Sequence, residues 1–434
     1  MTVGDAMGMA VKGLKPETVK QCFGTMDDFK DVRSFVGREI KHYRMKGLYG
    51  AQTQTALAVC DCMLDSRKAE VAEISDLFSQ LTAAGPEGYF GVFRGEESGF
   101  RQTVESFAER KLLIPAEQKY TGCGYPSLAV PIALYHQENS SELMAQCMET
   151  YALMTRDPLE VMGSALIGYL VTEFLALEPE TQGEGVPEKR AQLFLQNAAK
   201  ACETAEAVFK ERFPELWAEF GEDYNQGLKQ TFQGMAERFN LEEGPLFTWI
   251  CDNASRYGKV KIMHPTQGHV LTLLPLALYL VLKGGNDFQS ILTRALNMGK
   301  EAPKLGTLAG AFAGALYGFE SIPQLWKTGL VNAKEIRARG EALSLQRQAK
   351  GLKDLHDMEQ GLTGKEAEER KRYLPKTAQK PAKKAAPVLD LWDDEQDAPR
   401  IPRKEDAGKW REFERDKSRT KRDRRRNLKS DFDN

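Results

Sequence analysis

Apolar residues recur every three to four positions along most of this chain, and that spacing is the strongest constraint on its fold. In residues 51–65, Leu57, Cys60 and Leu64 fall on one helical face, and residues 187–211 repeat the pattern. No segment shows the sustained alternation of apolar and polar residues that is typical of a strand. The sequence therefore predicts an all-α body.

Turn residues cluster at several points within the first 335 residues, but none of these clusters has the composition of a domain linker. They fall at residues 84–88, 121–126, 179–187 and 284–287. We therefore expect one helical domain over residues 1–335. Its segment 305–318 is rich in Gly and Ala, which predicts a helix that crosses its neighbours closely inside the core.

The C-terminal part of the chain differs in composition. Residues 336–374 are polar and charged, and we expect them to form a charged helical extension. Residues 375–387 consist mainly of Pro, Ala and Lys, which cannot build a core. The sequence therefore predicts a disordered tail over residues 375–434, with an acidic-aromatic element at 388–397 and a basic element at 400–429.

The seven cysteines and five histidines show no spacing typical of a disulfide framework or a metal site. The chain starts without a basic stretch before an apolar run, so we expect no signal peptide. The apolar runs 161–177 and 270–282 are interrupted or short, whereas a membrane span needs about 20 apolar residues. We expect them to be core helices of a cytoplasmic protein with reduced thiols and no membrane partner.

Four separated motifs carry the clearest functional information. They are GDAMGMAV at residues 4–11, followed by KGLKPE; KGLYGAQTQ at 46–54; GCGYP at 122–126, with PIAL at 131–134 and TRDP at 155–158; and NMGKEAPK at 297–304, with YG at 317–318 and IPQLW at 322–326.

In this order and spacing, the four motifs resemble the ADP-ribosylglycohydrolase family, which includes the dinitrogenase reductase-activating glycohydrolases and the J1 crystallins. The resemblance covers roughly residues 1–335. It implies a compact all-α fold with a central cleft. In active members this cleft holds a pair of Mg²⁺ ions and an ADP-ribosyl group, and a water molecule is activated for attack at the anomeric carbon.

The motifs of this chain lack most of the acids that the resemblance implies. Lys12 stands where the family has a glutamate, and the family's Thr-Asp-Asp is replaced by Gly50, Ala51 and Gln52, followed by Thr53. The family's Gly-Asp-Thr-Asp-Thr is replaced by Lys300, Glu301, Ala302, Pro303 and Lys304, and its Gly-Asn-Gly-Ala by Gly122, Cys123, Gly124 and Tyr125. Only Asp5 and Glu301 remain as acids at motif positions. Because Mg²⁺ needs several oxygen ligands and is repelled by ammonium groups, we expect a cleft without metal or cofactor.

Several of these residues also have plain structural interpretations. Asp5 is either a residual acid of the cleft or a helix cap and buried hydrogen-bond acceptor. Lys12, Lys300 and Lys304 either form a pocket for phosphate or another anion, or they replace the metal charge structurally or face solvent. Gly124 belongs to a segment that either presents backbone N–H groups to a phosphate or is a simple turn. Cys123 is expected to be a packed thiol.

The tail combines basic and aromatic residues on a chain of net charge −2. Residues 365–434 carry a net charge of +6, and residues 1–364 carry −8. Within the acidic-aromatic element, Leu391 and Trp392 suit an apolar groove on a protein partner. The basic element suits a nucleic acid, through Trp410 and through Arg424, Arg425 and Arg426. The alternative is a solvated tail that only improves solubility.

These observations lead to the hypothesis of a catalytically inactive ADP-ribosylglycohydrolase-like protein. It would act as a binding or scaffold module whose tail recruits a partner. Two alternatives stay open: an active ADP-ribosyl hydrolase with an atypical site built on Asp5 and Glu301, and a nucleic-acid- or ribosome-associated factor that binds through the basic tail. Family members usually have a further half-helix before the Gly-Asp motif, so either the start lies upstream or that helix is shortened here.

Overall fold

The computed structural model describes residues 1–108, 124–137, 139–177, 186–258, 261–347 and 351–373. All of these residues lie in the first of two contact units, Met1–Lys383, and the second unit is Lys384–Asn434. The predicted disordered tail and its two elements lie outside the described residues, as does Cys123.

The described residues form helices joined by turns, and within them there is no β-strand, only two isolated bridges. The prediction of an all-α fold is therefore confirmed. The α-helices are α1 (Thr2–Gly8), α2 (Pro16–Phe23), α3 (Ala51–Ser66), α4 (Val71–Ala83), α5 (Ser98–Ala108), α6 (Ala129–Tyr135), α7 (Ser140–Ala152), α8 (Pro158–Ala176), α9 (Glu188–Arg212), α10 (Pro214–Phe220), α11 (Glu222–Asn225), α12 (Gly227–Arg238), α13 (Glu243–Ala254), α14 (Val270–Leu282), α15 (Phe288–Asn297), α16 (Ala302–Tyr317), α17 (Gln324–Gly329), α18 (Ala333–Ser344) and α19 (Leu355–Tyr373). Three short 3-10 helices, η1 (Arg33–Phe35), η2 (Pro126–Leu128) and η3 (Phe319–Ser321), complete the set.

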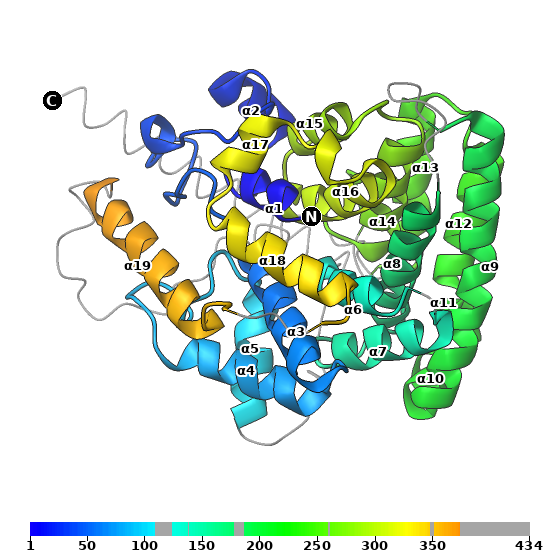
Figure 1. Ribbon diagram of the computed structural model, residues 1–434. Coiled ribbons are helices and arrows are strands. Elements are labelled where there is room, and N and C mark those ends of the chain that lie inside the picture. Colours follow the sequence, from blue (N-terminus) through cyan, green and yellow to red (C-terminus); the bar gives the residue numbers. More distant parts are fainter. Residues whose placement is uncertain (109–123, 138, 178–185, 259–260, 348–350, 374–434) are drawn as a thin grey trace, which may run out of the picture. The chain divides into compact units, whose positions relative to one another are not determined.

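Helices α8, α14 and α16 form the centre of the core (Figure 1). Every residue of α14 is buried, and α16 is buried continuously through its first three turns. Helix α16 packs against α1, α8, α14 and α15, while α8 also packs against α6, α7 and α9. The start of α8 is fixed by Asp157, whose side chain accepts a hydrogen bond of 2.9 Å from the backbone N–H of Leu159, and by Pro158 in the first turn.

Glycines let α1 and α16 cross at close range. A Cβ atom added to Gly4 would lie 1.9 Å from the carbonyl oxygen of Gly306, and one added to Gly306 would lie 2.6 Å from that of Gly4. No side chain fits at such distances. The close crossing predicted for residues 305–318 is thus confirmed, and it places the first and fourth motifs side by side.

Helix α8 is long and apolar enough to cross a membrane by length and composition alone. However, 72% of its apolar window is buried inside the fold. A core helix passes the same test, and the packing of α8 against its neighbours is that of a core helix.

Helix α18 packs against α3 and α6, and a buried arginine secures it. The guanidinium of Arg339 donates to both carboxylate oxygens of Asp61, at 2.7 and 3.1 Å. It also donates to Glu335 at 3.0 Å and to the carbonyl oxygen of Lys353 at 2.7 Å. A two-bond arginine–carboxylate pair of this kind fixes orientation as well as distance.

A second buried arginine attaches α19. Arg94 is fully buried, and its Nη2 atom lies 2.7 Å from Oε2 of Glu359. The same guanidinium donates to Thr363 at 2.7 Å and to the carbonyl oxygen of Tyr49 at 2.9 Å. Tyr49 in turn donates from its hydroxyl to Glu359 at 2.5 Å. The residues predicted as a charged extension therefore contain most of α18 and all of α19, and both helices pack on the rest of the fold. The domain boundary at residue 335 stays a prediction.

We predict that replacing Glu359 by Ala destabilises the protein, because it leaves the buried guanidinium of Arg94 without its carboxylate. Loss of one partner of such a pair costs about 3–5 kcal/mol of unfolding free energy. Urea unfolding measures it. Glu368 is an exposed residue of the same helix, so Glu368→Ala should change the unfolding free energy by less than about 0.5 kcal/mol. Equal effects of the two substitutions would contradict the role of the ion pair.

Candidate functional site

Asp5 is fully buried in α1 and faces the start of α3. Its Oδ2 atom accepts hydrogen bonds from the backbone N–H groups of Gly50 and Thr53, both at 3.0 Å, and from the Thr53 hydroxyl at 2.8 Å. Burial raises the pKa of Asp5, although these hydrogen bonds oppose the shift. The contacts of Oδ2 match a helix cap, whereas Oδ1 of Asp5 is buried without a hydrogen-bond partner among the described residues.

The next motif residues are also engaged within the fold. Gln52 is buried, donates from its amide to the carbonyl oxygen of Gly124 at 2.7 Å and accepts from the hydroxyl of Ser127 at 3.3 Å. Ala51 donates its backbone N–H to the carbonyl oxygen of Arg94 at 2.8 Å. Gly124 is therefore held against α3 by the side chain of Gln52, which stands at the position of a family acid.

Glu97 lies between two lysines of the first and fourth motifs. Its Oε1 atom is 3.2 Å from Nζ of Lys12, and its Oε2 atom is 3.1 Å from Nζ of Lys304. Lys12 also donates to the carbonyl oxygen of Gly95 at 2.8 Å, and Lys304 lies 3.1 Å from Oε2 of Glu301. These four side chains are Lys12, Glu97, Glu301 and Lys304, and we call them the cleft ion cluster after the central cleft that the family resemblance implies.

The charges of the cleft ion cluster stabilise one another. Burial alone would raise the pKa of Glu97, but Lys12 and Lys304 outweigh it and lower that pKa to about 2. Burial would lower the pKa of Lys304, but Glu301 and Glu97 outweigh it and raise it well above its usual value. The side chain of Lys304 is only 7% exposed. Both partners are therefore held in their ionised forms.

Backbone geometry joins the first and fourth motifs beside this cluster. The N–H of Gly13 donates to the carbonyl oxygen of Lys300, and the N–H of Lys300 donates to that of Leu14, both at 2.7 Å. Gly299 and Lys300 have φ angles of +65° and +50°, a left-handed conformation that favours glycine. Pro303 lies in the first turn of α16, close to α1. A Cβ atom added to Gly8 would lie 2.6 Å from the Cα atom of Pro303.

Comparison with known proteins identifies the family of this chain and a solved structure of similar fold. A sequence profile of the ADP-ribosylglycohydrolase family matches residues 1–353. The chain belongs to this family. A solved structure described as an ADP-ribosylglycohydrolase-related protein complex is similar in fold, with a TM-score of 0.51 and 21% identity over 80% of this chain and 94% of that chain. No curated protein matches in sequence.

The residues at the ADP-ribosylglycohydrolase metal positions do not fit a pair of Mg²⁺ ions. Mg²⁺ requires near-octahedral oxygen ligands. Here one oxygen of Asp5 receives three hydrogen bonds, and the ammonium groups of Lys12 and Lys304 lie against the carboxylates of Glu97 and Glu301. Ala51 and Pro303 offer no side-chain ligand.

The structure places the described candidates in three separate sets of contacts and adds one residue, Glu97, that the sequence did not indicate. Contacts connect Asp5 and Thr53 with Gly50, Gln52 with Gly124, and Lys12 with Glu301 through Glu97 and Lys304. Glu97 was missed because it lies in no motif. Outside the described residues lie Cys123, Leu391, Trp392, Trp410, Arg424, Arg425 and Arg426.

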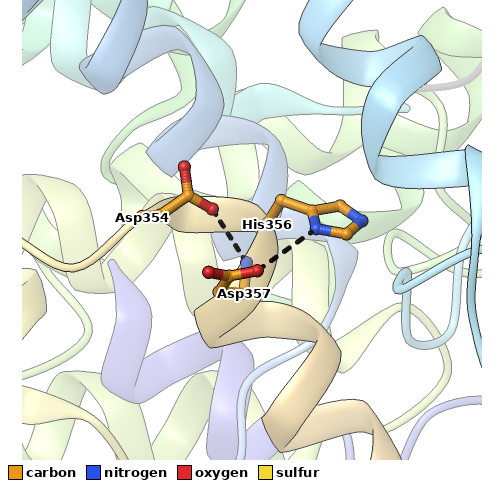
Figure 2. Close-up of side chains that lie close together, drawn as sticks. All are labelled: Asp354, His356 and Asp357. Carbon is orange, nitrogen blue, oxygen red and sulfur yellow. Dashed lines mark hydrogen bonds and ion pairs between the residues drawn. The ribbon is translucent and has the colours of Figure 1, made fainter.

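A separate group with possible cation ligands lies at the start of α19. Figure 2 shows Asp354, His356 and Asp357, whose ligand atoms lie within 4.8 Å of one another. Asp354 accepts from the backbone N–H of Asp357 at 2.9 Å, and His356 Nδ1 lies 3.8 Å from the carboxylate of Asp357. Because both acids are exposed and Asp354 caps the helix, the group is explained as a helix start.

We predict that Glu97→Gln lowers stability in a pH-dependent way. The pKa of Glu97 falls from 4.5 to about 2 on folding, so its contribution is complete above about pH 4.5 and is lost as the pH falls through about 2. The variant should lose roughly 1–3 kcal/mol of unfolding free energy near neutral pH. The difference from the wild type should shrink between those two pH values.

Urea unfolding at a series of pH values checks this prediction, with Glu105→Gln as the control. Glu105 is an exposed acid of the neighbouring helix α5. Its replacement should leave the pH profile unchanged. A difference between Glu97→Gln and the wild type that does not vary with pH would contradict the prediction.

Proposed function

We propose that this ADP-ribosylglycohydrolase-family chain is catalytically inactive and acts as a binding or scaffold module in the cytoplasm. One observation carries the proposal: Glu97 pairs with Lys12 and Lys304, at 3.2 and 3.1 Å, at the place where the family's metal chemistry is expected. An ammonium group repels a divalent ion, and at an effective dielectric near 20 each such contact costs several kcal/mol.

The position of Asp5 supports the same proposal. Hydrolysis of a glycosidic bond needs an activated water and a group that accepts its proton. Oδ2 of Asp5 accepts hydrogen bonds from backbone N–H groups at the start of α3. Lys12 stands at the position of the family's glutamate. Glu301 pairs with Lys304 at 3.1 Å. These contacts support the proposal that none of the three side chains acts as a general base.

The tail supplies the partner-binding part of the proposal. Its acidic-aromatic element is suited to a protein groove, and its basic element to phosphates. We propose that the protein partner is the principal one, and that Leu391 and Trp392 anchor it. Nucleic-acid binding through the basic element is the outcome that would favour the second alternative.

The first prediction of this proposal is that the purified protein does not release ADP-ribose from arginine- or serine-linked substrates, with or without Mg²⁺. The reason is that Lys12 stands at the position of the family's glutamate and that Lys12 and Lys304 pair with carboxylates at the proposed site. Chromatography of released ADP-ribose measures it, with an active family member as the positive control. Turnover above background that disappears in Glu301→Gln would instead establish the hydrolase with an atypical site.

The second prediction concerns partner capture by the full chain. Leu391→Ala with Trp392→Ala should abolish retention of a protein partner in a pull-down. Replacing Arg424, Arg425 and Arg426 by Ala should leave it nearly unchanged. If the three arginines instead control capture, and capture is of nucleic acid and falls steeply with salt, the nucleic-acid alternative is correct.

A truncated control must keep α19. Ending the chain at residue 345 would remove Glu359 and leave Arg94 buried without its partner, so any loss of binding would be confounded by unfolding. A chain ending after Tyr373 keeps this pair and removes only the tail. Capture of the same partner by that shorter chain would show that the tail is a solubility appendage.

A further inference from the structure

One carboxylate serves two ammonium groups in the cleft ion cluster. Glu97 uses Oε1 for Lys12 at 3.2 Å and Oε2 for Lys304 at 3.1 Å. A carboxylate that bridges two metal ions likewise gives one oxygen to each cation. Two further contacts of these ammonium groups are also to oxygen: that of Lys12 to Gly95 at 2.8 Å and that of Lys304 to Glu301 at 3.1 Å.

We infer that the cleft is a cation site which the chain fills with its own side chains, the ammonium groups of Lys12 and Lys304 standing in for a bound cation pair. This inference rests on the proposed absence of metal catalysis in the same cleft. The inference adds two points. Glu97 and Glu301 are arranged to bind cations, and the ammonium groups of Lys12 and Lys304 exclude metal ions and other cations from solution.

The location of Lys304 favours this inference over a chance pairing. It lies in the first turn of α16, where the helix dipole disfavours a positive charge. Its side chain is 7% exposed, and that of Lys12 is 13% exposed. A buried cation at a helix N-terminus requires nearby anions, and Glu97 and Glu301 provide them.

Removing the lysines should therefore open a site for an added cation. In the full-length double variant with Lys12→Ala and Lys304→Ala, the two glutamates would face each other without a counter-charge, which should lower Tm. Propylammonium corresponds to the part of the lysine side chain that Ala lacks. Because it would bind the folded state, millimolar propylammonium should recover at least half of the decrease in Tm. Tetramethylammonium has the same charge but no N–H donors and should restore none.

Manganese provides the second readout. Electron paramagnetic resonance should detect Mn²⁺ bound to the double variant and none bound to the wild type. Lys300→Asn is the matched control, because it removes a lysine four residues from Lys304 that is not part of the cleft ion cluster, and Asn tolerates the left-handed backbone there. This control should bind no Mn²⁺ and should not respond to propylammonium.

Stoichiometric Mn²⁺ binding by the wild type would overturn the inference, as would a double variant that is as stable as the wild type and indifferent to both cations. If the double variant does not fold, Lys12→Ala alone is tested in the same way, and an unchanged Tm overturns the inference. Turnover by a wild type that binds no Mn²⁺ would remove the proposed function but leave this inference standing, so the two failures are distinguishable.

Discussion

A fully buried guanidinium must have its charge matched and its donors satisfied, and Arg94 meets this requirement with groups from two parts of the chain. Glu359 and Thr363 come from α19, and the carbonyl oxygen of Tyr49 lies just before α3. The backbone carbonyl oxygen of Arg94 also accepts from Ala51 at the start of α3. The match to the family ends at residue 353, before α19 begins. A helix beyond the family match therefore helps to fix the segment that leads to Glu97, three residues after Arg94.

The carboxylates of this site are bound by groups of the same chain. Oδ2 of Asp5 accepts from the start of a helix, and Glu97 and Glu301 accept from ammonium groups. Oδ1 of Asp5 is buried without a hydrogen-bond partner among the described residues. In a site of low dielectric, unmatched carboxylates repel one another strongly, so the substituted lysines and the retained acids are best understood as one unit.

Helical spacing and four motifs were sufficient to predict the all-α fold and the family. They could not indicate Glu97, which lies 85 residues from Lys12 and 207 from Lys304 in a segment without a motif. They also could not reveal that Glu359 is buried, because the residues of a charged helix are normally expected to be solvated. Only the fold shows that Arg94 is its buried partner. The sequence allowed two interpretations of Asp5 and could not indicate its contacts with Gly50 and Thr53, which lie 45 and 48 residues away.

The sharing of Glu97 by two lysines couples substitutions at positions that are far apart in the sequence. Lys12→Glu alone would set a new carboxylate beside Glu97, and loss of Lys304 alone would leave Glu301 without the ammonium group that it contacts and Glu97 with Lys12 only. Each single substitution would therefore cost stability unless a compensating one accompanied it. The two lysines and their glutamates are thus expected to change together or not at all.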